Sequence, residues 1–448
     1  MLPSSLDFNP KEKSIRANNF RMNIQTTPGG SYTQNQTIKV SLPPLSTGFC
    51  DLKNSYLKFE IKKANDTAAV LDKSVYSLFK RITTFTGHGT VIERLNNVGA
   101  YYNTMLDFKS NIGSYKNAIG NAGLQGLPSA GYNLKTTALQ FCVPFHHGLF
   151  SSEKMIPCFT DRPIRMEFEL EANANIALSG DVANNAFTLE NVEFVAACVD
   201  FEPSDFAMLK QSSNNFKFSF EGVENYQDSV TNGSTSATSQ LPFRYSSLNN
   251  ILLIHRNQAN LNAEGQLTQS NRSAANMTQL SYFLNGSRIP IKPLKRITGG
   301  DLDQRVSSEM FVETYSTINS VNDMMFTKHT SGLMVNKMTL TDGTAVATAL
   351  PGNNFYTFEV ENGTLANANT YRQDRLSTVG SFAVAIDFTK LKAPELKSDI
   401  YDGLNSTGND IFSEIVYATI PAQMLLDYYC NYTATIMIDQ NNQIQVFN

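Results

Sequence analysis

The feature that most constrains the fold of this chain is a two-residue period in its hydrophobic pattern. Between residues 164 and 171, apolar and charged side chains alternate without interruption: Ile164, Met166, Phe168 and Leu170 against Arg165, Glu167, Glu169 and Glu171. Successive side chains of a β-strand point to opposite faces, so this segment is predicted to be a strand with one buried and one solvated face.

The same period recurs along the chain and predicts an all-β fold. Strands are expected at residues 37–42, 57–62, 139–143, 164–171, 192–201, 216–220, 250–255, 382–388, 433–438 and 443–447. Two of them, 382–388 and 433–438, are apolar on both faces, which is typical of strands that are covered on both sides.

Only a few short helices are expected. Residues 96–110 place their apolar side chains at helical spacing. Helices are also expected at 203–210 and at 422–429, because Pro203 and Pro421 suit the first turn of a helix. These helices would lie in the connections between strands.

The elements together describe two β-sandwiches in tandem. Many short strands with few helices are typical of sandwiches and barrels, and 448 residues correspond to two or three domains of about 150 residues each. The chain divides best near residues 202–215. The sequence predicts an N-terminal arm at 1–24, a first sandwich at 25–202, a linker helix at 203–213 and a second sandwich at 214–448.

Charge is sparse and nearly balanced, which bears on the partners of the chain. Lys and Arg number 36 and Asp and Glu 40, a net charge of −4, while Asn alone outnumbers Asp and Glu together. Such a chain has no bulk electrostatic reason to hold nucleic acid strongly. Residues 1–25 contain four basic and two acidic residues, so we expect the arm to tether the chain to a neighbouring subunit rather than to bind a genome.

The cysteines and the apolar segments limit the cellular setting. Five cysteines far apart in the sequence form neither a disulfide framework nor a CxxC motif, so we expect buried free thiols in a reducing compartment: Cys50, Cys142, Cys158, Cys198 and Cys430. The first residues lack the pattern of a secretory signal, and no stretch approaches the ~18 apolar residues of a membrane helix. We therefore expect a chain that is made and assembled inside a cell, is not secreted and has no transmembrane segment.

The order of the segments resembles that of a known protein family. The resemblance rests on residues 38–45, 49–61, 77–82, 89–95, 101–108, 143–150, 155–158, 164–171, 379–388 and 432–447. In this order the chain is similar to the major capsid proteins of icosahedral double-stranded DNA viruses that are built from two tandem jelly rolls, especially the smaller polinton-like and adintovirus-type relatives.

The resemblance implies a structural protein of the virion and not an enzyme. It implies two jelly-roll sandwiches, and a homotrimer that acts as a pseudo-hexameric capsomer of an icosahedral shell. The implied partners are neighbouring capsomers, penton proteins and minor capsid or cement proteins. It implies no catalytic residue, no metal ligand and no cofactor. The sparse charge agrees with this, because an unpaired charge buried between subunits costs far more than a hydrogen-bonded amide.

Three polar connections are long enough to need a function of their own. They lie at residues 113–132, 257–279 and 341–354. Together with the arm, these loops are expected to cover the top of the trimer or to contact neighbouring capsomers.

Some residues match chemical sites in part, and each also has a structural interpretation. Glu167, Glu169 and Glu171 share one face of a predicted strand, as the acids of a glycosidase groove can, but Lys or Arg on adjacent strands would pair with them equally well. His146 and His147 are adjacent, so in an extended segment they point opposite ways and cannot chelate one ion. The sequence contains no GxSxG, GxxxxGK[ST] or HExxH motif.

Three further features also have structural interpretations. His88 lies between two glycines, which predicts a turn. Phe216, Phe218 and Phe220 could stack on bases, yet three Phe on one face are typical of a core. The basic segment 293–297 carries two charges, which is too few to bind a nucleic-acid backbone tightly.

Two alternative functions stay open at this point. The first is a carbohydrate-active or carbohydrate-binding β-sandwich, which the absence of Trp disfavours because Trp is the best surface for stacking on sugars. The second is a virion spike or adhesin that binds receptors with its loops, although the sequence shows no shaft repeat. Electron microscopy distinguishes them, because a capsid protein forms blocks or shells, an enzyme compact globules and a spike elongated projections.

Overall fold

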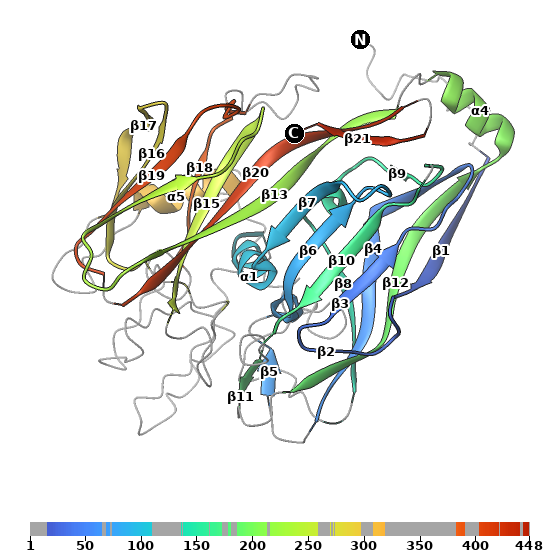
Figure 1. Cartoon of the computed structure of the whole chain (residues 1–448), viewed down its shortest axis with the longest axis horizontal. Helices are drawn as coiled ribbons and strands as arrows, with labels where there is room; N and C mark the ends of the chain where they lie inside the picture. Colours follow the sequence, from blue (N-terminus) through green and yellow to red (C-terminus); the bar gives the residue numbers. More distant parts are fainter. Residues whose placement is uncertain are drawn as a thin grey trace, which may run out of the picture.

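The computed structural model of the chain describes residues 16–64, 69–71, 74–109, 136, 138–160, 162–172, 178–180, 186–212, 216–258, 269, 272, 274–296, 308–318, 382–389, 403–420, 422–439 and 442–447. Their strands form two sandwiches that lie side by side (Figure 1), one from each half of the chain. Each sandwich consists of two antiparallel sheets whose inner faces contribute to the hydrophobic core.

The first sandwich takes its strands from residues 17–201. One sheet has the order β1 (Ala17–Gln25), β12 (Phe187–Phe201), β4 (Gly48–Lys63) and β8 (Leu139–Pro144), with β2 (Tyr32–Thr33) beside β12 and β9 (Ile156–Pro157) beside β4. The other has the order β3 (Thr37–Ser41), β10 (Arg165–Leu170), β6 (Phe79–Phe85) and β7 (Val91–Asn96). A separate pair joins β5 (Ala69–Leu71) to β11 (Leu178–Gly180).

The second sandwich takes its strands from residues 216–447. One sheet has the order β13 (Phe216–Val230), β20 (Met424–Ile438), β15 (Leu248–Asn257) and β18 (Val384–Asp387), with β21 (Ile444–Phe447) beside β20. The other has the order β14 (Ser236–Leu241), β19 (Ile411–Tyr417), β16 (Met277–Leu284) and β17 (Ser287–Lys295).

The two sandwiches have the same strand order. If the eight strands of the two four-stranded paths in each half are numbered along the chain, one sheet has the order first, eighth, third and sixth. The facing sheet has the order second, seventh, fourth and fifth. This is the order of a jelly roll, in which two Greek keys face each other. The predicted all-β fold of two tandem jelly-roll sandwiches is confirmed.

Three α-helices occur within the described residues. α1 (Val98–Lys109) follows β7, α4 (Pro203–Ser212) joins the sandwiches, and α5 (Ser308–Ile318) follows β17. α1 and α5 therefore occupy equivalent places, after the fifth strand of each half. The helices predicted at 96–110 and 203–210 are confirmed. The sequence did not reveal α5, because its Val and Thr residues favour strands. Two short 3₁₀ helices are η2 (Val75–Leu78) and η3 (Gly148–Ser151).

The helix predicted at 422–429 is wrong. From Met424 onward these residues form the start of β20, which lies between β13 and β15. All residues from 424 to 430 are buried. A strand that is covered on both faces loses the two-residue period, so its continuous apolar run resembles that of a buried helix.

The predicted alternation around β10 holds as far as Leu170. Met166, Phe168 and Leu170 are buried as predicted. The pairing with β6 shifts by a residue between Glu169 and Leu170, and the strand ends there. The prediction that Glu171 lies on the solvated face is therefore wrong, and this side chain is buried.

The division of the chain into domains at the predicted boundaries stays a prediction. β1 begins at Ala17, within the predicted arm, and pairs along its whole length with β12. α4 lies within the predicted linker, and β13 begins at Phe216.

Candidate functional site

The two sandwiches meet along an interior contact that we name the inter-sandwich joint. It contains Glu93, Asn97, Tyr101 and Glu171 of the first sandwich, Val223, Arg256, Asp427 and Tyr429 of the second, and Gln269 and Arg272 from the connection between β15 and β16. β13, an outer strand of its sheet, contacts β7 and η3 of the first sandwich. Figure 1 shows α1 between the two sandwiches.

Glu93 on β7 binds the outer edge of β13. Its Oε1 accepts a hydrogen bond of 2.8 Å from the backbone N–H of Val223. An edge strand leaves such groups without a neighbouring strand, so the carboxyl group satisfies a donor that would otherwise be buried alone. Burial raises the pKa of Glu93 to about 8, although the N–H groups of Val223 and Leu149 act to lower it. The group is therefore largely protonated at neutral pH.

Asp427 on β20 is the centre of a buried polar network. Arg256 on β15 donates from Nε to Oδ2 over 2.6 Å, and the two side chains are only 5% and 0% exposed. Oδ1 accepts hydrogen bonds from Gln227 at 2.7 Å and from Asn97 at 2.9 Å. Since Asn97 belongs to the first sandwich, this carboxylate holds the start of α1 against the second. The three donors compensate for the loss of water around a buried charge.

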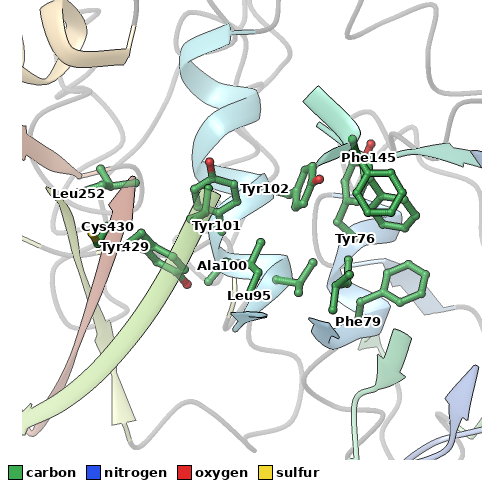
Figure 2. Close-up of a cluster of buried hydrophobic side chains, with 14 of the residues drawn as sticks. Tyr76, Phe79, Leu95, Ala100, Tyr101, Tyr102, Phe145, Leu252, Tyr429 and Cys430 are labelled. Atoms are coloured by element: carbon green, nitrogen blue, oxygen red, sulfur yellow. The ribbon is translucent and has the colours of Figure 1, made fainter. Parts of the chain in front are cut away.

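Figure 2 shows that α1 packs into both sandwiches. Tyr101 points toward Tyr429 of the second sandwich, and their ring centroids are 5.2 Å apart. The adjacent Tyr102 stacks on Tyr76 of the first sandwich, with centroids 4.1 Å apart. The hydroxyl of Tyr429 also donates to the backbone carbonyl of Asn97 over 3.0 Å. Neighbouring residues of one helix therefore contribute to two cores, which fixes the helix between them.

Two described residues of the connection between β15 and β16, which is predicted at 257–279 to make contacts between subunits, contact the first sandwich. Gln269 donates to the backbone carbonyl of Ser77 at 3.0 Å and to Glu171 at 3.3 Å. Arg272 donates to the hydroxyl of Thr104 on α1 at 2.7 Å. Both side chains are buried and belong to the joint, while the contacts of the connection with other subunits stay a prediction.

Glu171 is a second buried carboxyl group at the joint. Burial raises its pKa to about 7, while the positive charges of Arg256 and Lys80 act to lower it. Arg256 thus stabilises a carboxyl group of the first sandwich in addition to its ion pair with Asp427. The ionisation of Glu171 in the first sandwich therefore depends on the charge of Arg256 in the second.

Gly99 allows the close approach of this connection to α1. A Cβ at this position would lie 1.4 Å from Oε1 of Gln269 and 2.8 Å from Cα of Ser77. We expect Gly99→Ala to lower the free energy of unfolding by about 1–3 kcal/mol, because overpacking outweighs the gain in helix propensity. Urea unfolding followed by circular dichroism measures this. Gly29→Ala is the matched control, since nothing lies within 4 Å of its Cβ. A stabilised Gly99→Ala protein would contradict the placement of Gln269.

The carboxylates of the carbohydrate alternative already have partners within the sheet. Lys39 on β3 lies 3.7 Å from Glu167. Lys80 on β6 lies 3.1 Å from Glu169, which also pairs with Arg81. The expected pairing with basic residues on adjacent strands is confirmed for these two acids. Because Glu171 is buried at the joint, the three do not line one groove.

Of the two adjacent histidines, His147 lies in the interior of the first sandwich and His146 is exposed. His147 is buried, and its Nδ1 lies 2.6 Å from the hydroxyl of Tyr102. The backbone N–H of His146 donates to the same hydroxyl at 2.7 Å. Burial, with a smaller effect of His146, lowers the pKa of His147 to about 3. His88 lies in the predicted turn, between β6 and β7.

The remaining candidate residues have structural roles. The ring of Phe216 packs on Phe49 and Phe159 at 6.0 and 5.2 Å, and Phe220 is buried, so the interpretation as core is confirmed. Arg296 of the basic segment is buried. The cysteines are free, and all are buried except Cys142, which is half-buried.

Some expectations concern metals, membranes or parts of the chain outside the described residues. In the part of the chain that the structure describes, no group of three or more His, Cys, Asp or Glu is placed to hold a metal ion. None of the helices among the described ranges is long and apolar enough to cross a bilayer. Residues 1–15 of the predicted arm and the connections at 113–132 and 341–354 lie outside these ranges.

The sequence did not reveal the joint. Glu93 is followed by Arg94, and Arg256 follows His255 at the end of an apolar run, whereas Asp427 interrupts an apolar strand segment. Such a charge is a usable signal, because its burial is unfavourable unless a partner compensates it. The partner cannot be read from the sequence, since Asn97 and Asp427 are 330 positions apart.

The strand order and the joint together define a double jelly-roll protein. No protein-family model and no curated protein sequence matches the chain. Solved structures match it over nearly its full length. The PBCV-1 virus capsid gives a TM-score of 0.61 at 9% sequence identity and covers 98% of each chain. The crystal structure of PBCV-1 VP54 gives 0.60 at 10% identity and also covers 98% of each chain. The Faustovirus major capsid protein gives 0.52 at 9% identity, covering 96% of this chain and 92% of that chain. At these identities the likeness shows the fold, which is that of viral capsid proteins with two jelly rolls.

Proposed function

We propose that the protein is a major capsid protein that forms homotrimers, and that these trimers are the pseudo-hexameric capsomers of an icosahedral double-stranded DNA virus. The observation that supports this proposal is the similarity of the fold to the PBCV-1 capsid over 98% of the chain. The proposed location is the virion. The proposed partners are neighbouring capsomers, penton proteins and minor capsid or cement proteins.

The repeated strand order supports a geometric function. Two sandwiches of the same order give one chain two similar units, so three copies arranged around a threefold axis present six. A block of this kind tiles a shell only if its units keep a fixed orientation. The inter-sandwich joint supplies this rigidity through the Arg256–Asp427 ion pair, the Glu93 hydrogen bond and the Tyr101–Tyr429 contact.

The mass of the purified protein in solution tests the proposal. Light scattering is expected to give a particle of about three times the 49.6 kDa of one chain. Negative-stain electron microscopy is expected to show blocks with six lobes and threefold symmetry. A protein that stays a monomer at micromolar concentration and forms neither blocks nor shells would contradict the proposal.

The same preparation distinguishes the alternatives. Elongated projections in the micrographs would support a spike or adhesin instead. Hydrolysis of a polysaccharide that disappears in Glu167→Gln and Glu169→Gln would support the carbohydrate enzyme. Because both acids lie in exposed or half-buried ion pairs, we expect neither substitution to change the trimer.

A further inference from the structure

Three buried thiols form a row across three adjacent strands of the first sandwich. Cys50 lies on β4, Cys198 lies on β12 on one side of it, and Cys158 directly follows β9 on the other side. Cys50 and Cys198 are 0% exposed and Cys158 is 3% exposed. Cys198 is directly opposite Cys50, and the backbone N–H of Cys158 donates to the carbonyl of Gly48 on β4 at 2.9 Å, so all three residues lie on neighbouring segments of one sheet. The expectation of buried free thiols does not account for this arrangement, because cysteines that are far apart in the sequence need not lie close together in the fold.

The strand register makes one of the two pairs suited to a disulfide. Cys50 and Cys198 are directly opposite each other in antiparallel strands. Residues in this relation have Cα atoms about 4.5–5.5 Å apart, which lies within the 4.4–6.8 Å that a disulfide requires. Cys158 is placed differently, because Cys50 is opposite Ile156, two residues earlier. Such a diagonal relation separates Cα atoms by about 7–8 Å, which is too far without backbone movement.

We propose that Cys50 and Cys198 are a modification site, at which a low-molecular-weight disulfide such as oxidised glutathione forms a reversible disulfide that locks β4 to β12. The thiolate of Cys50 attacks one sulfur of the reagent, forms a mixed disulfide and releases one reduced thiol. The thiolate of Cys198 then attacks the Cys50 sulfur and releases the second. The protein loses two protons and two electrons, which reduce the reagent to two thiols.

Access to Cys50 requires a local opening of the sheet, and β9 provides the place for it. β9 has only two residues, Ile156 and Pro157, and it covers the side of β4 opposite β12. A strand this short opens at little cost compared with the long β4–β12 pairing. The Cys158 thiol and burial raise the pKa of Cys50, although the Cys198 thiol acts to lower it, and the Cys50 thiol and burial raise the pKa of Cys198. The exchange is therefore slow at neutral pH and faster at mildly alkaline pH. Once formed, the disulfide is sheltered in the core.

The disulfide would close a loop of roughly 150 residues between two inner strands of their sheet. A constraint of this length restricts the unfolded chain more than the folded one. For a sandwich of this size we expect the melting temperature of the first sandwich to rise by about 5–10 °C on oxidation.

The experiment uses the full-length protein, first reduced and then equilibrated with oxidised glutathione at mildly alkaline pH. Intact-mass spectrometry is expected to show the loss of two hydrogens, and peptide mapping to show the Cys50–Cys198 linkage. Calorimetry is expected to show the higher melting temperature, which returns to its first value after reduction. Cys50→Ala and Cys198→Ala are expected to abolish both the linkage and the rise.

The controls are the thiols that lack a directly opposed partner. Cys158→Ala tests the diagonal neighbour, and Cys430→Ala tests a buried thiol of the second sandwich; both variants are expected to keep the linkage and the thermal shift. Five free thiols after prolonged oxidation would overturn the proposal. So would a Cys50–Cys158 linkage, a glutathione adduct as the end product, or a linkage without a rise in melting temperature.

Discussion

Replacing Arg256 by methionine is expected to lower the free energy of unfolding by about 3–5 kcal/mol, because it removes one partner of a fully buried ion pair. Asp427 would keep the amides of Asn97 and Gln227 but lose its only cationic partner among the described contacts. Glu171 would lose the same positive charge, since Arg256 acts on both carboxyl groups. The loss should also weaken the attachment of α1 to the second sandwich.

Urea unfolding of wild type and variant at equal protein concentration measures this effect. Glu167→Gln is the matched control, because it removes a carboxylate from a largely exposed pair and is expected to cost less than about 1 kcal/mol. The double variant Arg256→Met with Asp427→Leu should recover much of the loss, since it leaves no charge buried alone. If Arg256→Met were as stable as Glu167→Gln, the pair would not be buried in solution.

The stability of the protein is expected to be highest between pH 4.5 and pH 6.5 and to fall on both sides of this window. On the alkaline side, burial raises the pKa of Glu93 from 4.5 to about 8 and that of Glu171 to about 7. The folded state therefore holds protons that the unfolded state has released. Their contribution is complete below pH 4.5 and is lost as the pH rises through 7 and 8. Glu224, whose pKa is also raised by burial, acts in the same direction.

On the acidic side, the buried histidines have the opposite effect. Burial lowers the pKa of His147 and of His255 from 6.5 to about 3. Between these values the unfolded state binds protons that the folded state excludes, so this contribution is complete above pH 6.5 and is lost as the pH falls. Between pH 4.5 and 6.5, the histidines make the protein more stable as the pH rises and the glutamates make it less stable, and the two effects nearly cancel. Each of these four groups changes the free energy of unfolding by about 3–5 kcal/mol between its unfolded and its folded pKa.

The melting temperature measured as a function of pH checks this expectation. Single substitutions distinguish the groups that act on the acidic side of the profile from those that act on the alkaline side. Glu93→Gln should flatten the alkaline side, because an amide does not ionise. His255→Phe should flatten the acidic side and leave the alkaline side unchanged. Glu167→Gln should leave the whole profile unchanged, as its carboxylate lies outside the joint. A wild-type profile that stays level from pH 6.5 through 8 would refute the assignment of Glu93 and Glu171.

The fold could be predicted where a strand has one solvated and one buried face. The alternation from Met166 to Leu170 gave the correct strand and the correct buried side chains, because a register slip of one residue would expose them all. The prediction failed for segments that do not have one solvated and one buried face. β20 is covered on both faces at 424–430, so its apolar run predicts a helix where the structure has a strand. The change of register between Glu169 and Leu170 is followed by Glu171, which is buried where the alternation predicts a solvated side chain.

The joint could not be predicted for a different reason. Its contacts connect residues that are from 98 to 332 positions apart, and no local pattern specifies which pairs meet. Glu93 is followed by Arg94, so the sequence does not mark it as buried, and its partner, the backbone N–H of Val223, carries no sequence signal either. Gln269 and Arg272 lie in a polar connection, where polarity is also typical of exposed loops.

The contact at the joint is made by unlike edges of two similar units. β7 is the fifth strand of the first unit and β13 is the first strand of the second. Their counterparts are β17 and β1, which lie at opposite ends of the molecule in Figure 1, and Ile291 on β17 is 90% exposed. If β17 of one molecule met β1 of the next, the head-to-tail contact inside each chain would be repeated between chains. Such a series closes on itself after three molecules only if each step turns by about 60° without a rise along the axis; a turn that does not divide the full circle into a whole number of steps, or a rise at each step, produces an open spiral. The angle that the joint sets between the two sandwiches would then decide whether the molecules form a closed ring or an endless filament.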